Sequence, residues 1–198
     1  MKVIKIILFL LFSSNSIFSS EYEITVLATN TANFGGIGEW SFSALLENDE
    51  EKILFDTGFN ENTVIHNAKL LKKDLSVVEK VILSHFHGDH TGGLIKLRKT
   101  YMDINPKAFS QVYVAEGFFE QRYDAEGNLR GFIGGFNEVN SFLSATQELG
   151  IKFTIINKPT EISKNLFLSG PVERVYEKVV VSPGFFIKKG GKLEADLV

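Results

Sequence analysis

Three of the chain's four histidines lie within six residues, and this cluster constrains the chain more than any other feature. The segment 84–93 reads Ser-His-Phe-His-Gly-Asp-His-Thr-Gly-Gly, so His85, His87 and His90 stand close to Asp89. Imidazole and carboxylate groups are good ligands for zinc and for neighbouring divalent metals. The alternative is a polar loop that is rich in histidine by chance, and four ligand-type residues in six positions weigh against it. The pattern therefore predicts a metal site.

The segments on either side of this cluster predict a rigid support for it. Residues 80–84 are short, apolar and β-branched, which is typical of a buried strand. Gly88 permits a tight turn, and Thr91 is expected to cap a helix over 94–100. A strand that leads through a turn into a helix holds ligands well, because both flanks are rigid.

The spacing of the four ligand-type residues has a geometric consequence. His85 and His87 are two positions apart in extended backbone, so their side chains point the same way. Asp89 and His90 follow the glycine and can aim at a second point nearby. The spacing therefore provides for parts of two metal sites that lie close together.

This motif resembles the His-x-His-x-Asp-His pattern of the metallo-β-lactamase superfamily. The resemblance implies that His85 and His87 hold one metal ion and that Asp89 and His90 hold a second. Asp89 would also orient the attacking water and is the expected catalytic residue. In that family two metals acidify a water, which then attacks a carbonyl or phosphoryl centre. Zinc is the expected metal, with iron or manganese as alternatives, and the expected substrate is a small ester, phosphoester or cyclic amide.

A second segment supports the same resemblance. Residues 52–58 read Lys-Ile-Leu-Phe-Asp-Thr-Gly, a predicted strand followed by Asp56. The resemblance implies that Asp56 lies beneath the metal site and accepts a hydrogen bond that orients the ligands. The alternative is an aspartate that ends its strand and caps the next helix. The fourth histidine, His66, falls on a helix predicted over 61–73 without ligand-type neighbours, so it is expected at the surface.

The remaining pattern alternates short strands with helices, which predicts an α/β (α+β) domain over residues 21–198. Strands are expected over 22–29, 41–47, 52–55, 80–84, 111–115, 151–156 and 165–168, and helices over 61–73, 94–100 and 139–149. The resemblance implies a metallo-β-lactamase-like αββα sandwich.

The family also takes further metal ligands from later strands. This chain has no histidine after His90 and no cysteine, so the C-terminal part of the family's domain is expected to be missing. Two alternatives to a working hydrolase therefore stand: a non-catalytic metal-binding remnant, and a half-domain that needs a partner chain.

Glycine-rich residues 117–136 are the least regular stretch. They contain a set of aromatic side chains: Phe118, Phe119, Tyr123, Phe132 and Phe136. Either they form a flap that binds a ring-containing substrate, or they are ordinary core aromatics under a long loop. Residues 38–43 and 170–174 resemble a branch of the superfamily that includes dihydropterin-linked phosphate synthases, and Arg174 is expected in a surface ion pair.

The N-terminus predicts export. Residues 1–20 combine two early lysines, an unbroken apolar run over 6–12 and a small polar tail, as in a secretory signal peptide cleaved near Ser19 or Ser20. The alternative is a buried N-terminal strand or an uncleaved anchor. The mature protein is expected in the periplasm or secreted, without a stable membrane span. A net charge of -3 with scattered basic residues predicts a small-molecule substrate rather than nucleic acid, and a homo-oligomer is possible.

Overall fold

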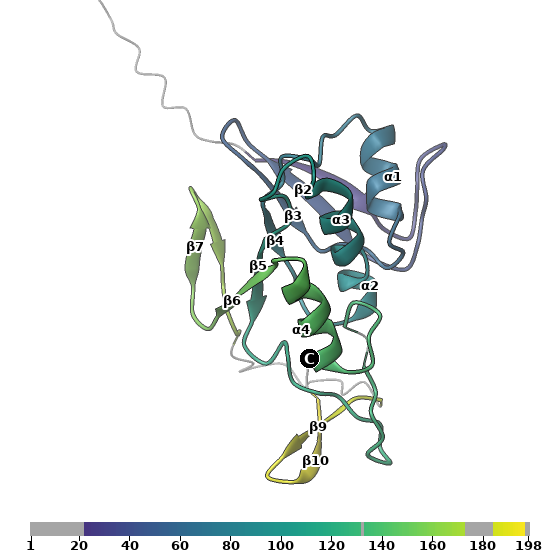
Figure 1. The fold of residues 1–198 in the computed structure, drawn as a ribbon, viewed down its shortest axis with the longest axis vertical. Helices are drawn as coiled ribbons and strands as arrows, with labels where there is room; N and C mark the ends of the chain where they lie inside the picture. The colour runs from purple at the N-terminus through teal and green to yellow at the C-terminus, as the bar shows by residue number, and fades with distance from the viewer. Residues whose placement is uncertain (1–21, 132, 173–183, 197–198) are drawn as a thin grey trace, which may run out of the picture.

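A computed structural model describes residues 22–131, 133–172 and 184–196. Its centre is a six-stranded mixed sheet in the order β1-β2-β3-β4-β5-β6 (Figure 1). These strands are β1 (Glu23–Ala28), β2 (Ser43–Glu47), β3 (Lys52–Phe55), β4 (Lys80–Ile82), β5 (Gln111–Ala115) and β6 (Lys152–Ile156). Strands β1 to β3 pair antiparallel, whereas β3 to β6 pair parallel. Parallel neighbours need crossover connections, and the helices occupy these connections.

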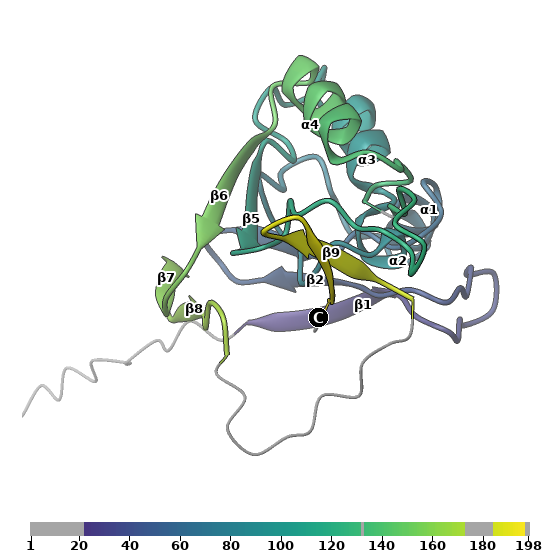
Figure 2. The same ribbon diagram turned by 90° about the horizontal axis from the view of Figure 1, so that it is seen from below.

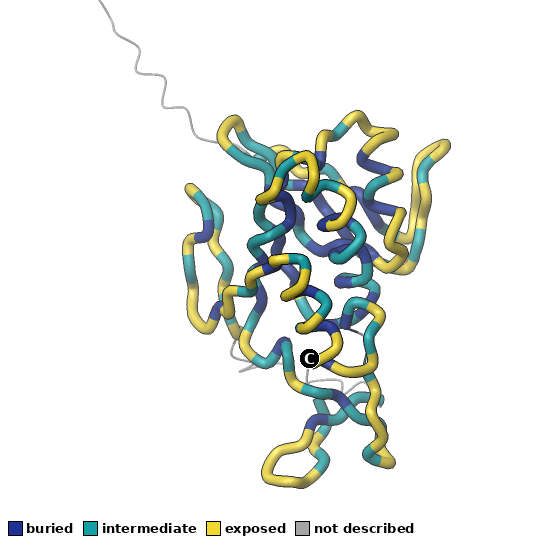
Figure 3. The backbone as a smooth tube through the Cα atoms, viewed as in Figure 1, coloured by how far each residue is buried: buried dark blue, intermediate teal, exposed yellow. Residues whose placement is uncertain are grey.

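The helices lie on one side of the sheet, as the view in Figure 2 shows. They are α1 (Thr63–Leu70), α2 (Gly88–Thr91), α3 (Leu94–Tyr101) and α4 (Val139–Glu148). The main core fills the space between the two layers and contains Leu45, Leu54, Val64, Val81, Leu94, Leu97, Val112 and Phe142. Burial is accordingly deepest along the middle of the molecule (Figure 3). None of the helices in the described part of the chain has the length and apolar character that a membrane crossing requires.

The opposite face of the sheet carries a smaller apolar cluster. The hairpin of β7 (Thr160–Ser163) and β8 (Leu166–Leu168) packs there, where Ile162 meets Ile53 and Ile82. A further hairpin, β9 (Phe186–Lys189) and β10 (Lys192–Ala195), follows later in the chain. The sequence pattern did not predict β7, β9 or β10, because each of these strands is only 4 residues long and leaves too short a pattern to recognise.

The predicted α/β class is confirmed, and two local predictions need correction. The strand before the motif ends at Ile82, not at residue 84, because the Ser84 backbone N–H and hydroxyl both turn toward Asp56. Thr91 is not a helix cap: α2 begins at Gly88, and Thr91 lies inside it. Its hydroxyl donates to the carbonyl of His87 at 2.9 Å instead. The predicted signal peptide, Phe132 and Arg174 lie outside the described residues.

Candidate metal centre

Three of the predicted ligands converge in the turn between β4 and α2. Ligand atoms of His85, His87 and Asp89 all lie within 4.8 Å of one another, and the three side chains are half-buried. The rings of His85 and His87 face the same region, with their centroids 4.6 Å apart. Donors around a tetrahedral zinc ion lie about 3.4 Å apart, so small side-chain movements would bring this set into range. The chemistry and spacing of these donors therefore fit a divalent cation.

The fourth predicted ligand, His90, lies beside this group. Its ring centroid is 4.1 Å from that of His85, and its Nε2 atom is 3.5 Å from Asp89 Oδ2. Its other nitrogen, Nδ1, is 2.7 Å from Asp56 Oδ2. Because Nδ1 is engaged by the carboxylate, Nε2 remains the available ligand atom. The division of the four side chains between two ions stays a prediction.

Asp56 lies directly beneath the cluster, immediately after β3. Its side chain is almost completely buried, and its backbone has a positive φ of 53°. A non-glycine residue seldom adopts this conformation. Its carboxylate accepts three contacts at 2.7 Å, from the Ser84 backbone N–H, the Ser84 hydroxyl and His90 Nδ1. The alternative role as a helix cap is wrong, because the residue that precedes α1 is Asn62.

The electrostatic surroundings shift the pKa values of the three motif histidines in different directions. Burial lowers the pKa of His85 to about 3, and nearby positive charges add to this effect. Burial also lowers the pKa of His87. At His90 burial opposes protonation, but the hydrogen bond and charge of Asp56 and the charge of Asp89 outweigh it, so the pKa is raised. His85 and His87 are therefore neutral imidazoles near pH 7, which is the form that binds metal.

A buried arginine supports the motif from the side. The guanidinium of Arg122 stacks 3.7 Å from the ring centroid of Phe86, the residue between the first two motif histidines. Arg122 Nε donates to Asp196 Oδ2 at 2.8 Å, and Nη1 donates to the carbonyls of Phe118 and Glu120. This one side chain thus joins the motif to the segment after β5 and to the segment after β10. Sequence reasoning missed it, because nothing local marks an isolated arginine as buried.

Of the two interpretations of the aromatics in residues 117–136, the structure favours core packing. Phe118 is buried, and Phe119 and Phe136 pack against the same cluster. Tyr123 exchanges backbone hydrogen bonds with Phe186 at the edge of β9. The interpretation as core aromatics therefore holds for these side chains, because the long loop folds back over α4 and the sheet.

Different aromatic side chains border the metal centre. A cleft of about 510 Å³ is lined by Trp40, Phe59 and Phe185 together with His87 and Asp89. These three aromatics come from the β1–β2 loop, the segment before α1 and the segment before β9. They are far apart in the sequence, so no local pattern identifies them as neighbours.

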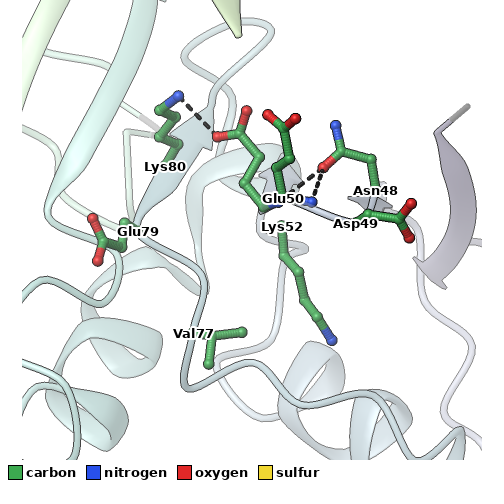
Figure 4. A pocket seen from close by; sticks show the side chains of 8 residues that line it. Asn48, Asp49, Glu50, Lys52, Val77, Glu79 and Lys80 are labelled. Carbon is green, nitrogen blue, oxygen red and sulfur yellow. Dashed lines mark hydrogen bonds and ion pairs between the residues drawn. The ribbon is translucent and has the colours of Figure 1, made fainter. Parts of the chain in front are cut away.

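Of the other hollows in the described part of the molecule, two approach this cleft in volume. One, of about 420 Å³, borders the motif at Ser84 and His85 and includes Arg122. The other, of about 390 Å³, lies at the start of β4, the end away from the motif, with Lys80, Glu79 and Lys52 around it (Figure 4). His66 is exposed as expected, with Nε2 2.8 Å from the carbonyl of Gly35.

Fold and site together define an α/β protein with a candidate metal-binding loop at the carboxyl end of a central parallel strand. The sequence profile of the Metallo-beta-lactamase superfamily matches residues 41–175. The chain belongs to this superfamily, as its motif indicates. A solved structure described as Tm1679, a metal-dependent hydrolase of the beta-lactamase superfamily, superposes with a TM-score of 0.61 at 29% identity. That match covers 89% of this chain and 58% of the other.

Two curated relatives from Methanocaldococcus jannaschii also match. An uncharacterized protein is 32% identical over 78% of this chain and 55% of its own length. A 7,8-dihydropterin-6-methyl-4-(beta-D-ribofuranosyl)-aminobenzene-5'-phosphate synthase is 27% identical over 63% of this chain and 40% of its own. The chain therefore spans about half the length of the curated relatives that it matches.

Proposed function

We propose that this protein is a metal-dependent hydrolase acting on a small ester, phosphoester or cyclic amide. The observation that carries the proposal is the convergence of His85, His87 and Asp89 beside a cleft that His87 and Asp89 line. These side chains would hold a divalent cation, which would supply an acidified water and polarise a carbonyl or phosphoryl oxygen. Zinc is the proposed metal, because histidine and aspartate at this spacing suit it, with iron and manganese as alternatives.

The residues of the chain have distinct roles in this proposal. His85 and His87 bind as neutral imidazoles, since burial lowers the pKa of each ring and disfavours the imidazolium form near pH 7. Asp89 accepts a hydrogen bond from the attacking water and orients it toward the cleft. Asp56 holds the Nδ1 proton of His90, so that Nε2 faces the cluster as an acceptor.

The experiment compares the wild type with His87→Ala and with His66→Ala, a matched histidine substitution at the surface. Each protein is assayed against carboxylic esters, phosphodiesters and lactones, and its metal content is measured. The proposal expects His87→Ala to lose both hydrolysis and metal, whereas His66→Ala keeps both. It fails if His87→Ala leaves hydrolysis and metal content unchanged.

A half-domain that is completed by a second chain is the other candidate. It is favoured by exposed apolar side chains on the sheet face away from the helices, where Ile24 stands opposite Leu46 in the β1–β2 pair and Val26 follows it. An exposed apolar strand at a sheet edge invites pairing with another chain. Gel filtration with light scattering distinguishes the candidates: a folded monomer excludes this one.

Export of the protein is part of the proposal and depends on residues 1–20. Their basic start, apolar run and polar tail are the support for it. N-terminal sequencing of the protein from an expressing cell tests it. A mature chain that begins near residue 20 or 21 agrees with export, and a chain that still begins at Met1 contradicts it.

A further inference from the structure

Two large aromatic side chains stand at the surface beside the metal centre. Trp40 is 78% exposed and Phe59 is 57% exposed, and both line the cleft that contains His87 and Asp89. Exposed apolar surface that gathers in a concave site marks a place where a ligand is bound. Their position needs an explanation, because each would be better buried in the absence of a ligand.

The carboxylate of Glu39 fixes the two aromatic residues relative to each other. Glu39 precedes Trp40 in the chain, and its Oε1 atom accepts from the Phe59 backbone N–H at 2.8 Å. Its Oε2 atom accepts from the Thr63 hydroxyl at 2.8 Å and from the Asn60 backbone N–H at 3.1 Å. Charge-assisted hydrogen bonds of this kind are among the stronger ones in proteins. The loop that carries Trp40 is therefore tied to the segment that carries Phe59.

The third wall of the cleft is braced by its own neighbours. The ring of Phe185 lies 5.2 Å from the ring of His87 and 5.7 Å from that of Phe86, measured between centroids. The guanidinium of Arg130 lies 4.8 Å from the centroid of Phe185 on this wall. Because side chains held in advance lose little freedom on binding, such walls favour a rigid ligand.

We infer that this cleft is a subsite for a neutral planar ring of the substrate, held between Trp40, Phe59 and Phe185 next to the bond that is broken. The inference rests on the proposed hydrolase function and names the substrate class of the same site. Aromatic walls favour a ring through offset and edge contacts, beyond the area that is buried. Among the described residues that line the cleft, Asp89 alone carries a formal charge, so the aromatic walls themselves offer no positive side chain to a charged ring. A volume of about 510 Å³ is ample for a fused two-ring group.

The test measures ring binding without any turnover. Trp40 is the chain's single tryptophan, so its indole N–H gives one isolated NMR cross-peak in the full-length protein. The probe is 2-naphthylmethanol, which has no hydrolysable bond, and the comparison ligand is its fully saturated analogue. The inference expects a saturable shift of the indole peak with the naphthyl alcohol. Binding of the saturated analogue should be at least about tenfold weaker.

Variants of the residues around the cleft show where naphthylmethanol binds. Phe59→Ala should weaken naphthylmethanol binding at least about tenfold, and Glu39→Gln should weaken it while metal content stays unchanged. Phe34→Ala is the matched control, because Phe34 is 99% exposed in the same loop but does not line the cleft. The amide spectrum of each variant confirms that it is folded.

The possible results separate this inference from the proposed function. Equal binding of the ring and its saturated analogue, or unchanged binding in Phe59→Ala, overturns the inference even if the protein hydrolyses esters. Ring binding that depends on Phe59 supports the inference, and a hydrolysis assay of the same preparation then judges the proposed function by itself.

Discussion

His90 Nδ1 lies 2.7 Å from Oδ2 of Asp56, a carboxylate that is 1% exposed. The same carboxylate accepts both hydrogen bonds from Ser84, the residue before His85. Asp56 therefore contacts both ends of the motif from below. A buried carboxylate with three donors holds its partners in one orientation, which is the support that a set of metal ligands needs.

The Asp56–His90 contact predicts a pH-dependent stability in the metal-free protein. The folded-state pKa of His90 is raised above its ordinary value of 6.5, so its protonation stabilises the fold. This contribution is fully present below pH 6.5 and is lost as the pH rises through the raised folded pKa. Asp56→Asn should remove it.

The measurement is denaturant unfolding of wild type and Asp56→Asn across this pH range, with metal removed by chelation. The difference in unfolding free energy should be larger below pH 6.5 than well above it, on top of a constant loss from the Ser84 hydrogen bonds. A difference that stays constant with pH contradicts the assignment. Imidazole NMR of the same samples should show the His90 pKa falling in the variant.

The buried pair of Arg122 and Asp196 predicts a strong coupling. Arg122→Met should lower the unfolding free energy by about 3 kcal/mol, because it leaves the carboxylate of Asp196 buried without its partner. Adding Asp196→Leu should recover much of the lost unfolding free energy, because an apolar pair has no charge whose burial opposes folding. Urea unfolding of both single variants and of the double variant gives the coupling energy.

Arg98 provides the control for this comparison of single and double variants. It is also buried, but it donates to the carbonyls of Leu149, Pro106 and Ala108, which carry no charge. Arg98→Met should destabilise the protein, and its effect should add to that of Asp196→Leu without coupling. Additive effects of Arg122→Met and Asp196→Leu would show that their contact does not stabilise the fold.

Gly92 and Gly93, which end the motif, have no room for a side chain. A Cβ atom at Gly92 would lie 2.1 Å from the backbone oxygen of Phe59, and one at Gly93 would lie 2.2 Å from that of Thr57. Gly92→Ala should therefore cost about 3 kcal/mol or more, because backbone atoms must move. Thermal unfolding measures the loss. In Gly184→Ala the nearest atoms belong to the flexible end of Arg130, so its melting temperature should change little.

Local patterns in the sequence predicted the parts of the site that are close in the chain. The apolar run before His85 predicted β4, and the spacing of His85 and His87 predicted that their rings would face one region. The resemblance of the Phe-Asp-Thr-Gly segment to the superfamily predicted Asp56 under the motif, and Asp56 lies there because β3 is a parallel neighbour of β4 and ends at the same edge. The aromatic walls of the cleft and the role of Arg122 depend on contacts between distant segments, which periodicity does not encode.

The errors have equally specific causes. Thr91 has a residue type that commonly caps helices, but it lies inside α2, where its hydroxyl donates to the His87 carbonyl, and Gly93 is the residue that precedes α3. For the aromatics after β5, composition left a flap and a core packing equally open, and the burial of Phe118 with Phe119 and Phe136 packed around it decides for the core. In both cases tertiary contacts decided what local propensity alone did not.

The central claim is that His85, His87 and Asp89 form a metal centre, and metal content per chain tests it most directly. The protein is purified, desalted and subjected to elemental analysis, beside His85→Ala and the surface control His66→Ala. The account predicts at least one equivalent of a divalent metal in the wild type and in His66→Ala, and its loss in His85→Ala. A wild-type content well below one equivalent, or an unchanged content in His85→Ala, would contradict it.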